Sequence, residues 1–319
     1  MSILFGYESA LTIYRWMRCP DRYPLSYVDV CTMQSAKAAL EGTRWASWDP
    51  LVKPAQLIVG PSSDIRRSAL SCGHAWGSRR AIWPARSLGN DAFVCDAPWV
   101  FLQMAQHIAG PDLVFAGCEL LSSYALCTQG VLQRPKLASR HETRGFLAGC
   151  TGYRSVNKAI SALGYTLENA RSPMEIALAL CLTLPPRMGG FGLPKPELNQ
   201  AIELSQRGRA IIGLDILTPD LYWPRFHLAG EYDSDEYHLL DRDIARDSRR
   251  RLALEASGIH VISITNEQMR SPHDMDAISG ELAHRMRYRM RYVGAEGEKR
   301  RSELQRRLRE IACHPELLA

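Results

Sequence analysis

The chain has 319 residues, of which 46% are hydrophobic, and a formal net charge of +5. This length can bury a full core and indicates roughly two domains of ordinary size. The modest charge is only a weak pointer to a polyanionic partner, and nine scattered cysteines without a CxxC pair argue against both a disulfide framework and a structural zinc site. We therefore expect a reduced, cytoplasmic globular protein.

The first half of the chain is predicted to mix helices and strands. Its apolar opening at Ile3–Phe5 is followed by Glu8, without the basic segment or cleavage site of a signal peptide, so neither a signal peptide nor a membrane span is expected. Helices are expected at 6–17, 36–40, 99–108, 113–125 and 144–162, the last with interruptions at Gly149 and Gly152. Strands are expected at 51–59 and 93–95.

The second half shows a more regular pattern. A helix should begin after Ser172 as N-cap and stop at Pro185, and a strand is expected at 211–217. After an acidic hairpin, a helix at 241–256 and an apolar strand at 259–265 complete one βαβ unit. These patterns predict an N-terminal mixed α+β domain (residues 1–165) and a C-terminal α/β domain (residues 166–319) that ends in basic helices.

The acidic hairpin is the most informative feature of the sequence. If Pro224 and Arg225 form a two-residue turn, the alternation of side chains places Asp220, Glu231 and Asp233 on one face of the hairpin. In this register Asp220 lies opposite Ala229 and one diagonal step from Glu231. The other face of the hairpin is uniformly apolar and is expected to pack on the core. This fixes the pairing register, so that the acidic side chains stay together on the opposite face.

Acidic side chains this close together repel one another unless a hard cation lies between them. Mg²⁺ or Mn²⁺ bound there would orient a water molecule and stabilise charge on a substrate phosphate. The alternative is a polar strand face that is simply exposed to solvent. The spacing of the acids alone leaves both interpretations open.

An ordered run of residues supports the first interpretation. Asp220, then Glu231-x-Asp233, then His238, and then Asp247-x-x-Arg250-x-x-x-Leu254-x-x-x-Gly258 with an apolar strand resemble the endonuclease-like domain related to very-short-patch repair endonucleases. That domain belongs to the PD-(D/E)XK nuclease superfamily. The match covers residues 172 to 270 approximately. It implies a three-layer α/β/α core with a mixed sheet, Asp220 and Glu231 as metal ligands, and Asp233 as a further candidate residue of the catalytic site.

The resemblance also implies a role for Glu175, because an acidic residue on the helix before the core sheet often joins the metal site in this superfamily. A second explanation is local. Glu175 stands three residues after Ser172, so it can complete a capping box and do no more than close the helix end. The two roles remain alternatives.

One position departs from the superfamily pattern, since Asp233 stands where the name-giving motif has lysine. His238 is a candidate replacement as general base or as electrostatic partner of the phosphate, against the alternative that it has no role. Asp247 is expected behind the site, with an ion pair along its own helix as the plainer account. Arg246 and Arg250 are expected to contact phosphate.

The N-terminal half resembles AbiEi-type antitoxin proteins of abortive-infection systems in three short segments. These are residues 6–11, 57–60 and 97–105. The resemblance implies a domain that recognises DNA or a protein partner from a defence or toxin–antitoxin system.

Together these features predict a Mg²⁺-dependent DNA endonuclease with a role in phage defence or DNA repair. The alternative is a non-catalytic DNA-binding or antitoxin-like regulator that retains the nuclease fold, which Asp233 favours. A glycosidase with paired carboxylates comes third, because no sugar-stacking aromatic platform is evident.

Overall fold

A computed structural model describes residues 2–35, 37–61, 65, 67–76, 80–233 and 241–318. The fold is mixed α/β, and its contacts divide the chain into unit 1 (Met1–Thr166 with Glu316–Ala319) and unit 2 (Leu167–Pro315). The division follows residue 166, beside the boundary predicted at 165, although the last four residues belong to unit 1. A search of the described helices finds none whose length and apolar character would let it cross a membrane.

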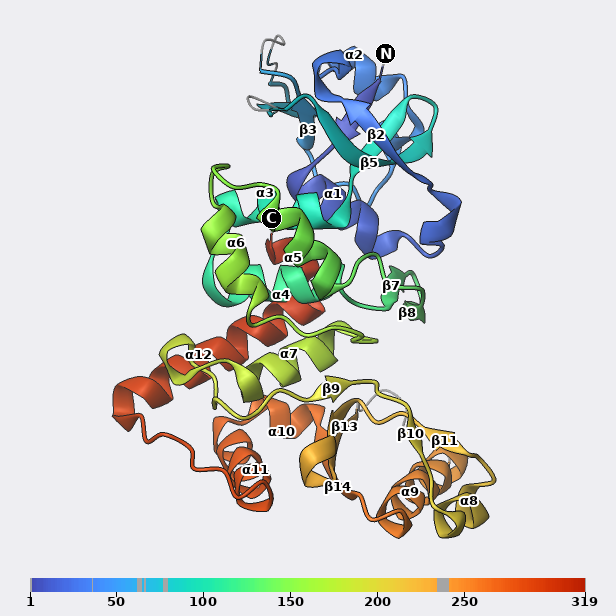
Figure 1. Ribbon diagram of the computed structural model, residues 1–319, viewed down its shortest axis with the longest axis vertical. Helices are drawn as coiled ribbons and strands as arrows, with labels where there is room; N and C mark the ends of the chain where they lie inside the picture. Colours follow the sequence, from blue (N-terminus) through green and yellow to red (C-terminus); the bar gives the residue numbers. More distant parts are fainter. Residues whose placement is uncertain are drawn as a thin grey trace. The chain divides into compact units, whose positions relative to one another are not determined.

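Unit 1 is built on a six-stranded mixed sheet with the strand order β2-β5-β6-β1-β3-β4 (Figure 1). The apolar opening of the chain forms β1, which lies inside this sheet with all three residues buried. β1 is parallel to β6 and β3 is parallel to β4, whereas the other neighbours are antiparallel. The strands are β1 (Ile3–Phe5), β2 (Leu25–Asp29), β3 (Ala55–Val59), β4 (Ser71–Ala75), β5 (Ile82–Gly89) and β6 (Ala92–Cys95).

The helices of unit 1 follow the predicted pattern with one error. The helix predicted at 113–125 ends at Leu120, and the residues after it form a hairpin of β7 (Tyr124–Cys127) and β8 (Gly130–Gln133). The predicted interruption near Gly149 is confirmed, since α5 and α6 are separate helices. The helices are α1 (Tyr7–Trp16), α2 (Lys37–Glu41), α3 (Ala97–His107), α4 (Gly110–Leu120), α5 (Arg140–Ala148) and α6 (Val156–Leu163).

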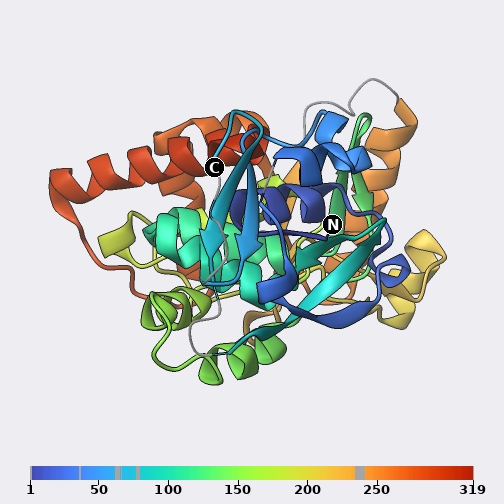
Figure 2. The same ribbon diagram turned by 90° about the horizontal axis from the view of Figure 1, so that it is seen from above.

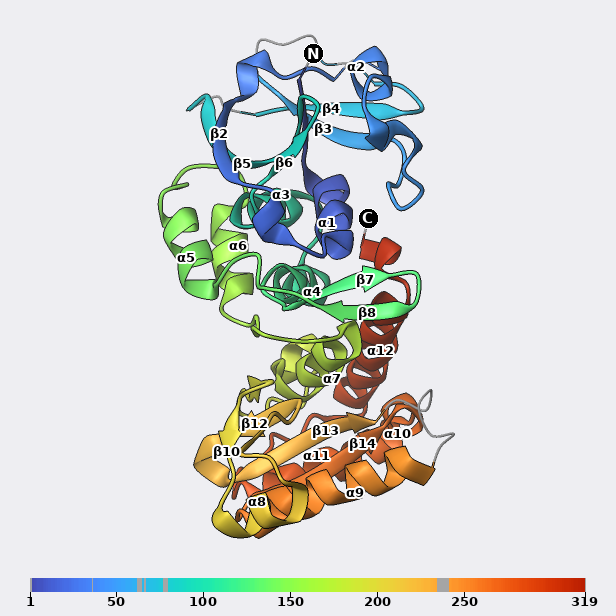
Figure 3. The same ribbon diagram turned by 90° about the vertical axis from the view of Figure 1, so that its right-hand side faces the viewer.

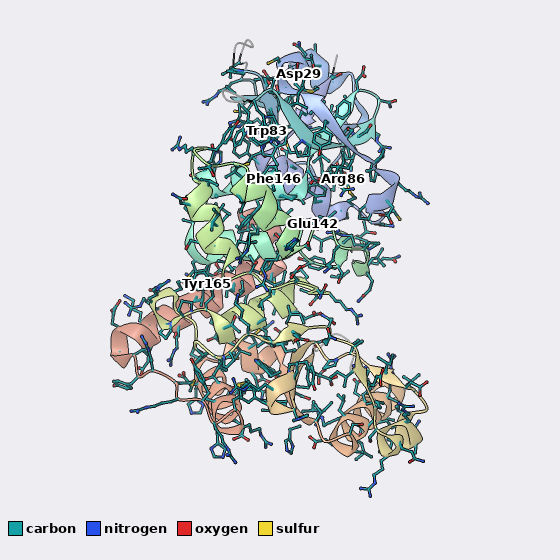
Figure 4. All side chains as sticks on the ribbon, viewed as in Figure 1. Asp29, Trp83, Arg86, Glu142, Phe146 and Tyr165 are labelled. Carbon is teal, nitrogen blue, oxygen red and sulfur yellow. The ribbon has the colours of Figure 1, made fainter. Side chains whose placement is uncertain are left out.

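Aromatic rings pack together in the core of unit 1. The rings of Trp83 on β5 and Trp99 on α3 are stacked with centroids 4.7 Å apart. Phe146 on α5 meets Trp83 at 6.1 Å (Figure 4). Trp83 and Trp99 are fully buried, so this cluster ties α3 and α5 to the sheet.

Unit 2 contains a four-stranded mixed sheet with the order β14-β13-β12-β9. β13 and β14 are parallel and are connected through α9, which confirms the predicted βαβ unit. β12 is antiparallel to both β13 and β9, and a separate two-stranded sheet pairs β10 with β11. The strands are β9 (Glu197–Leu198), β10 (Ile202–Glu203), β11 (Ile216–Leu217), β12 (Leu221–Trp223), β13 (Leu228–Asp233) and β14 (His260–Thr265).

The helices of unit 2 include one that the sequence pattern did not predict. Residues 206–212 form α8, so the strand predicted at 211–217 is reduced to β11, because Gly213 adopts a left-handed conformation (φ 72°) that ends the helix. The long helix α12 packs on α7 and is seen lengthwise in Figure 2. The helices are α7 (Pro173–Thr183), α8 (Gln206–Ile212), α9 (Asp241–Ala256), α10 (Asn266–Arg270), α11 (Pro272–Arg285) and α12 (Gly294–Cys313).

Helix α9 covers one face of the four-stranded sheet (Figure 3). Ala253 and Leu254 of α9 share an apolar cluster with Ala229 of β13. On the other face, the ring of Trp223 lies over the backbone of Gly230. The first half of β13, Leu228–Gly230, is therefore buried, whereas Glu231–Asp233 at its end are half-buried.

Candidate functional site

The hairpin of β12 and β13 has a different turn from the predicted one. Trp223 pairs with Leu228 instead of Phe226, because Pro224 opens a short 3-10 turn that ends at His227 in a left-handed conformation. The prediction of a two-residue turn is therefore wrong, and the observed register differs from the predicted one by two residues. A shift of two preserves the side-chain faces, and the observed pairing of Leu221 with Gly230 places Asp220 opposite Glu231. The two carboxylates thus lie closer than the diagonal placement predicted.

The face that carries the acids is not an exposed polar surface. Tyr222 and Ala229, on the same face, contribute to the apolar cluster under α9. The side chain of Glu231 is only 19% exposed, and Asp220 is half-buried. The acids lie at the end of a buried sheet because the strands continue past the edge of this cluster.

Asp220 is held in place by the strand opposite it. Its Oδ2 accepts a hydrogen bond of 2.8 Å from the backbone N–H of Tyr232. Its own carbonyl oxygen accepts from the N–H of Asn199 at 3.0 Å. Both contacts fix the start of β12 against its neighbours.

Glu175 is brought to the same place by α7. Ser172 is the N-cap of this helix, as predicted, and its Oγ accepts from the N–H of Glu175 at 3.2 Å. The second half of the predicted capping box, a hydrogen bond from the Ser172 N–H to the Glu175 carboxylate, is wrong. Oε2 of Glu175 instead accepts from the N–H of Arg171 at 2.9 Å and from Nδ2 of Asn199 at 2.6 Å. Glu175 is 6% exposed and faces inward, so it does more than close a helix end.

The electrostatics of this site are unbalanced. Burial and, after it, the nearby carboxylates of Glu175 and Glu231 raise the pKa of Asp220 to about 8, against the lowering effects of the Tyr232 N–H and Arg250. Burial also raises the pKa of Glu175, against the hydrogen bonds from Arg171 and Asn199. A cation at this site would lower both values.

Arg250 on α9 reaches the site. Its Nη2 donates to Oε1 of Glu231 at 3.1 Å and to the carbonyl oxygen of Thr218 at 3.3 Å. Arg250 therefore contacts an acid of the hairpin instead of standing free for phosphate. Arg246 and Asp247, one turn earlier, are exposed.

Of the two remaining predicted residues, the structure describes Asp233. Asp233 is half-buried at the end of β13, where it pairs in register with Thr265 of β14. His238 lies outside the described residues. Their predicted roles stay predictions.

Three residues that the sequence pattern did not single out organise the site. Nδ2 of Asn199 links Glu175 to the carbonyl oxygen of Asn169, and Asn199 adopts a left-handed conformation (φ 50°). The side chain of Arg171 donates to Oγ1 of Thr218 at 3.2 Å, while the Thr218 carbonyl accepts from Arg250. Asparagine in a short loop is a signal for a left-handed turn, but nothing in the sequence pairs it with Glu175.

The donor set fits a divalent cation held by two carboxylates. In the described part of the chain, no three His, Cys, Asp or Glu side chains form a group that could hold a metal ion. Mg²⁺ is usually bound by one or two carboxylates together with water and substrate phosphates, so Asp220 and Glu231 meet its ordinary requirement. Among the described residues, Asp220 accepts a hydrogen bond through Oδ2 and Glu231 through Oε1.

Comparisons with known proteins give relatives but no activity. The chain is 29% identical over 172 residues to two proteins of Mycobacterium tuberculosis, "Uncharacterized protein MT2308" of strain CDC 1551 / Oshkosh and "Uncharacterized protein Rv2248" of strain H37Rv. The match covers 54% of this chain and 54% of each relative, so the chain spans about half the length of the curated relatives it matches. No family model matches the sequence, and no solved structure matches it.

Proposed function

We propose that unit 2 is a Mg²⁺- or Mn²⁺-dependent DNA endonuclease with a restriction-endonuclease-like core. The observation that supports this proposal most directly is the raised pKa of Asp220, to about 8, beside Glu175 and Glu231. Half-buried acids that oppose one another's ionisation reduce stability unless a cation compensates, and such sites are often functional.

Asp220 and Glu231 are the proposed metal ligands, because the register of β12 and β13 places Asp220, directly before β12, opposite Glu231 on β13. A divalent cation bound there supplies an activated water and neutralises charge on the phosphate oxygens. Glu175 supports the site from α7 through Asn199, whose N–H also holds the Asp220 carbonyl.

Arg250 is proposed to supply the positive charge that the missing motif lysine would provide. Its guanidinium is 3.1 Å from Glu231 and also lowers the pKa of Asp220. Because α9 carries it to the strand ends, Arg250 reaches the site from outside the hairpin. Asp233 at the lysine position then does not by itself remove the positive charge from the site.

The test is a cleavage assay of the purified chain on supercoiled, linear duplex and single-stranded DNA with Mg²⁺ or Mn²⁺. We expect Asp220→Asn and Glu231→Gln to reduce the rate by roughly 100-fold or more, since each removes transition-state stabilisation. Asp215→Asn is the matched control, because Asp215 is 79% exposed and pairs with Arg209 away from the site. Equal rates in all three variants would reject the proposal.

One observation favours the non-catalytic alternative, in which the fold serves as a DNA-binding or antitoxin-like regulator. Glu231 already has a cationic partner in Arg250, so this acid is compensated without a metal. If the alternative holds, the chain shifts DNA in EDTA with a steep salt dependence, and Asp220→Asn leaves that shift unchanged.

A further inference from the structure

A pocket of about 430 Å³ lies between the hairpin tip and the end of α11, entirely within unit 2. Its floor is formed by Trp223 and Met286, which are 2% and 4% exposed. Phe226 and Tyr288 form its more exposed walls. The indole N–H of Trp223 donates to the carbonyl oxygen of Pro194 at 2.7 Å, which fixes the ring. The pocket thus presents flat aromatic surface on a rigid floor.

The rim of this pocket is basic. Lys195, Arg225 and Arg287 line it and are exposed, and no acidic residue is among the described residues that line it. Three cations around an aromatic cavity favour an anionic ligand with a planar ring.

Arg287 stands where the backbone favours glycine. The N–H of Tyr288 bonds to the carbonyl of Ala283 at 2.8 Å and the N–H of Arg287 to that of His284 at 3.0 Å, which is the Schellman arrangement at the end of α11. In this arrangement the residue that follows the helix C-cap needs a positive φ. Arg287 is that residue, and its φ is 49°. A non-glycine residue there costs about 1 kcal/mol. Arg287 therefore adopts a conformation that the local backbone disfavours for arginine, beside the pocket that its side chain lines.

We propose that this pocket binds a nucleoside phosphate, with the base against Phe226 and Tyr288 and the phosphate at Arg225 and Arg287. The volume lies in the range of pockets that enclose a small organic ligand. Bases stack on aromatic side chains whatever their identity, and guanidinium groups pair with phosphate oxygens.

The pocket is separate from the carboxylate site. Asp220 directly precedes β12, and Trp223 is the last residue of this strand. Trp223 lies over Gly230 on one face of the sheet, whereas the acids continue the face of Tyr222 and Ala229 that packs under α9. Nucleotide binding in this pocket does not depend on the nuclease proposal, and it is measured in EDTA so that the two proposals can fail separately.

The experiment measures binding of a fluorescein-labelled oligothymidylate to the full chain by anisotropy in EDTA, with adenosine monophosphate as competitor. We expect Arg287→Gly and Tyr288→Ser to weaken binding at least about fivefold. Arg287→Gly should keep or raise the melting temperature, since glycine suits the left-handed position, so a loss of binding cannot be ascribed to misfolding.

Arg289→Ala is the matched control, because Arg289 is exposed, carries the same charge and does not line the pocket. It should bind within about twofold of the unchanged chain. Competition by adenosine monophosphate would identify a free nucleotide as the ligand, and its absence an unpaired nucleotide of a strand; both support the proposal. The proposal is overturned if the unchanged chain binds neither probe, if Arg287→Gly binds normally, or if Arg289→Ala weakens binding equally.

Discussion

The two units bury charge in different ways. In unit 1, Arg15 on α1 and Glu119 on α4 form a two-bond ion pair at 2.9 and 2.7 Å, and both side chains are almost fully buried. Tyr124 adds a hydrogen bond of 3.3 Å to Glu119. In unit 2, Asp220 and Glu175 share a buried site with Glu231, and one guanidinium, that of Arg250, contacts Glu231.

This difference separates a structural pair from a candidate functional site. Buried ions remain stable when each has a partner of opposite charge and good geometry, which describes Arg15 and Glu119. The carboxylates around Asp220 instead exceed the positive charge beside them, and the raised pKa of Asp220 reports that excess. A buried acid whose neighbours oppose its ionisation is a reason to look for a ligand, whereas a compensated ion pair is not.

The largest expected effect follows from removing one member of the balanced pair. Glu119→Gln should lower the free energy of unfolding by about 3–5 kcal/mol, because it leaves Arg15 buried without its counter-charge. The measurement is chemical denaturation monitored by circular dichroism. The double replacement Arg15→Met with Glu119→Leu should recover most of the loss. A single variant within about 1 kcal/mol of the unchanged chain would contradict the structural assignment.

The next effect concerns the unbalanced site. Because the folded pKa of Asp220 is raised to about 8 from an ordinary value of 3.8, its contribution to stability is complete below pH 4 and is lost as the pH rises toward 8. The loss amounts to at most about 1.4 kcal/mol per pH unit in that window. Asp220→Asn, which keeps an acceptor for the Tyr232 N–H, should remove much of this slope, and the raised pKa of Glu175 should leave a smaller slope of the same sign.

Denaturation curves at several values between pH 5 and pH 8, in EDTA, measure this effect. Asp215→Asn serves as the control, since Asp215 is exposed and should leave the slope unchanged. Parallel pH profiles for the unchanged chain and Asp220→Asn would show that Asp220 is not the titrating group.

The smallest expected effect is that of Asp247. It is exposed on α9, one turn before Arg250, so Asp247→Ala should change the free energy of unfolding by less than about 0.5 kcal/mol. Arg250→Ala should cost more, because it removes the partner of Glu231. The same denaturation assay compares the two variants. An equal loss of free energy of unfolding in both would show that Asp247 contributes to the site as Arg250 does.

Much of the local structure of unit 2 could be predicted from sequence because its signals are local. The end of α7 is set by Pro185, its start by Ser172, and α9 with its following strand by apolar periodicity and Gly258. The strand predicted at 211–217 is confirmed only at Ile216–Leu217. It is wrong at Ile211 and Ile212, because these residues are apolar in either structure and their packing against α9 selected a helix.

The sequence predicted which side chains of the candidate site share a face of the hairpin. It did not predict the residues that they contact. Alternation along β12 and β13 fixes which side chains share a face, and the two-residue change in register left that result intact. The role of Asn199 could not be predicted, since it links Glu175 on a helix to the carbonyl of Asp220 across long sequence separations. Nor did any local signal indicate that Arg250 would pair with Glu231 instead of a neighbour on its own helix.

The sequence by itself determined α7, α9, β14 and the side-chain faces of the acidic hairpin, because strand alternation, helix capping and helix stops depend on near neighbours. Only the tertiary structure decided that Asp220, Glu175 and Glu231 lie close enough to raise a pKa, since that depends on burial and on distances between separate elements. It also decided where the basic pocket forms, because the end of α11 and the hairpin tip meet only in the folded chain.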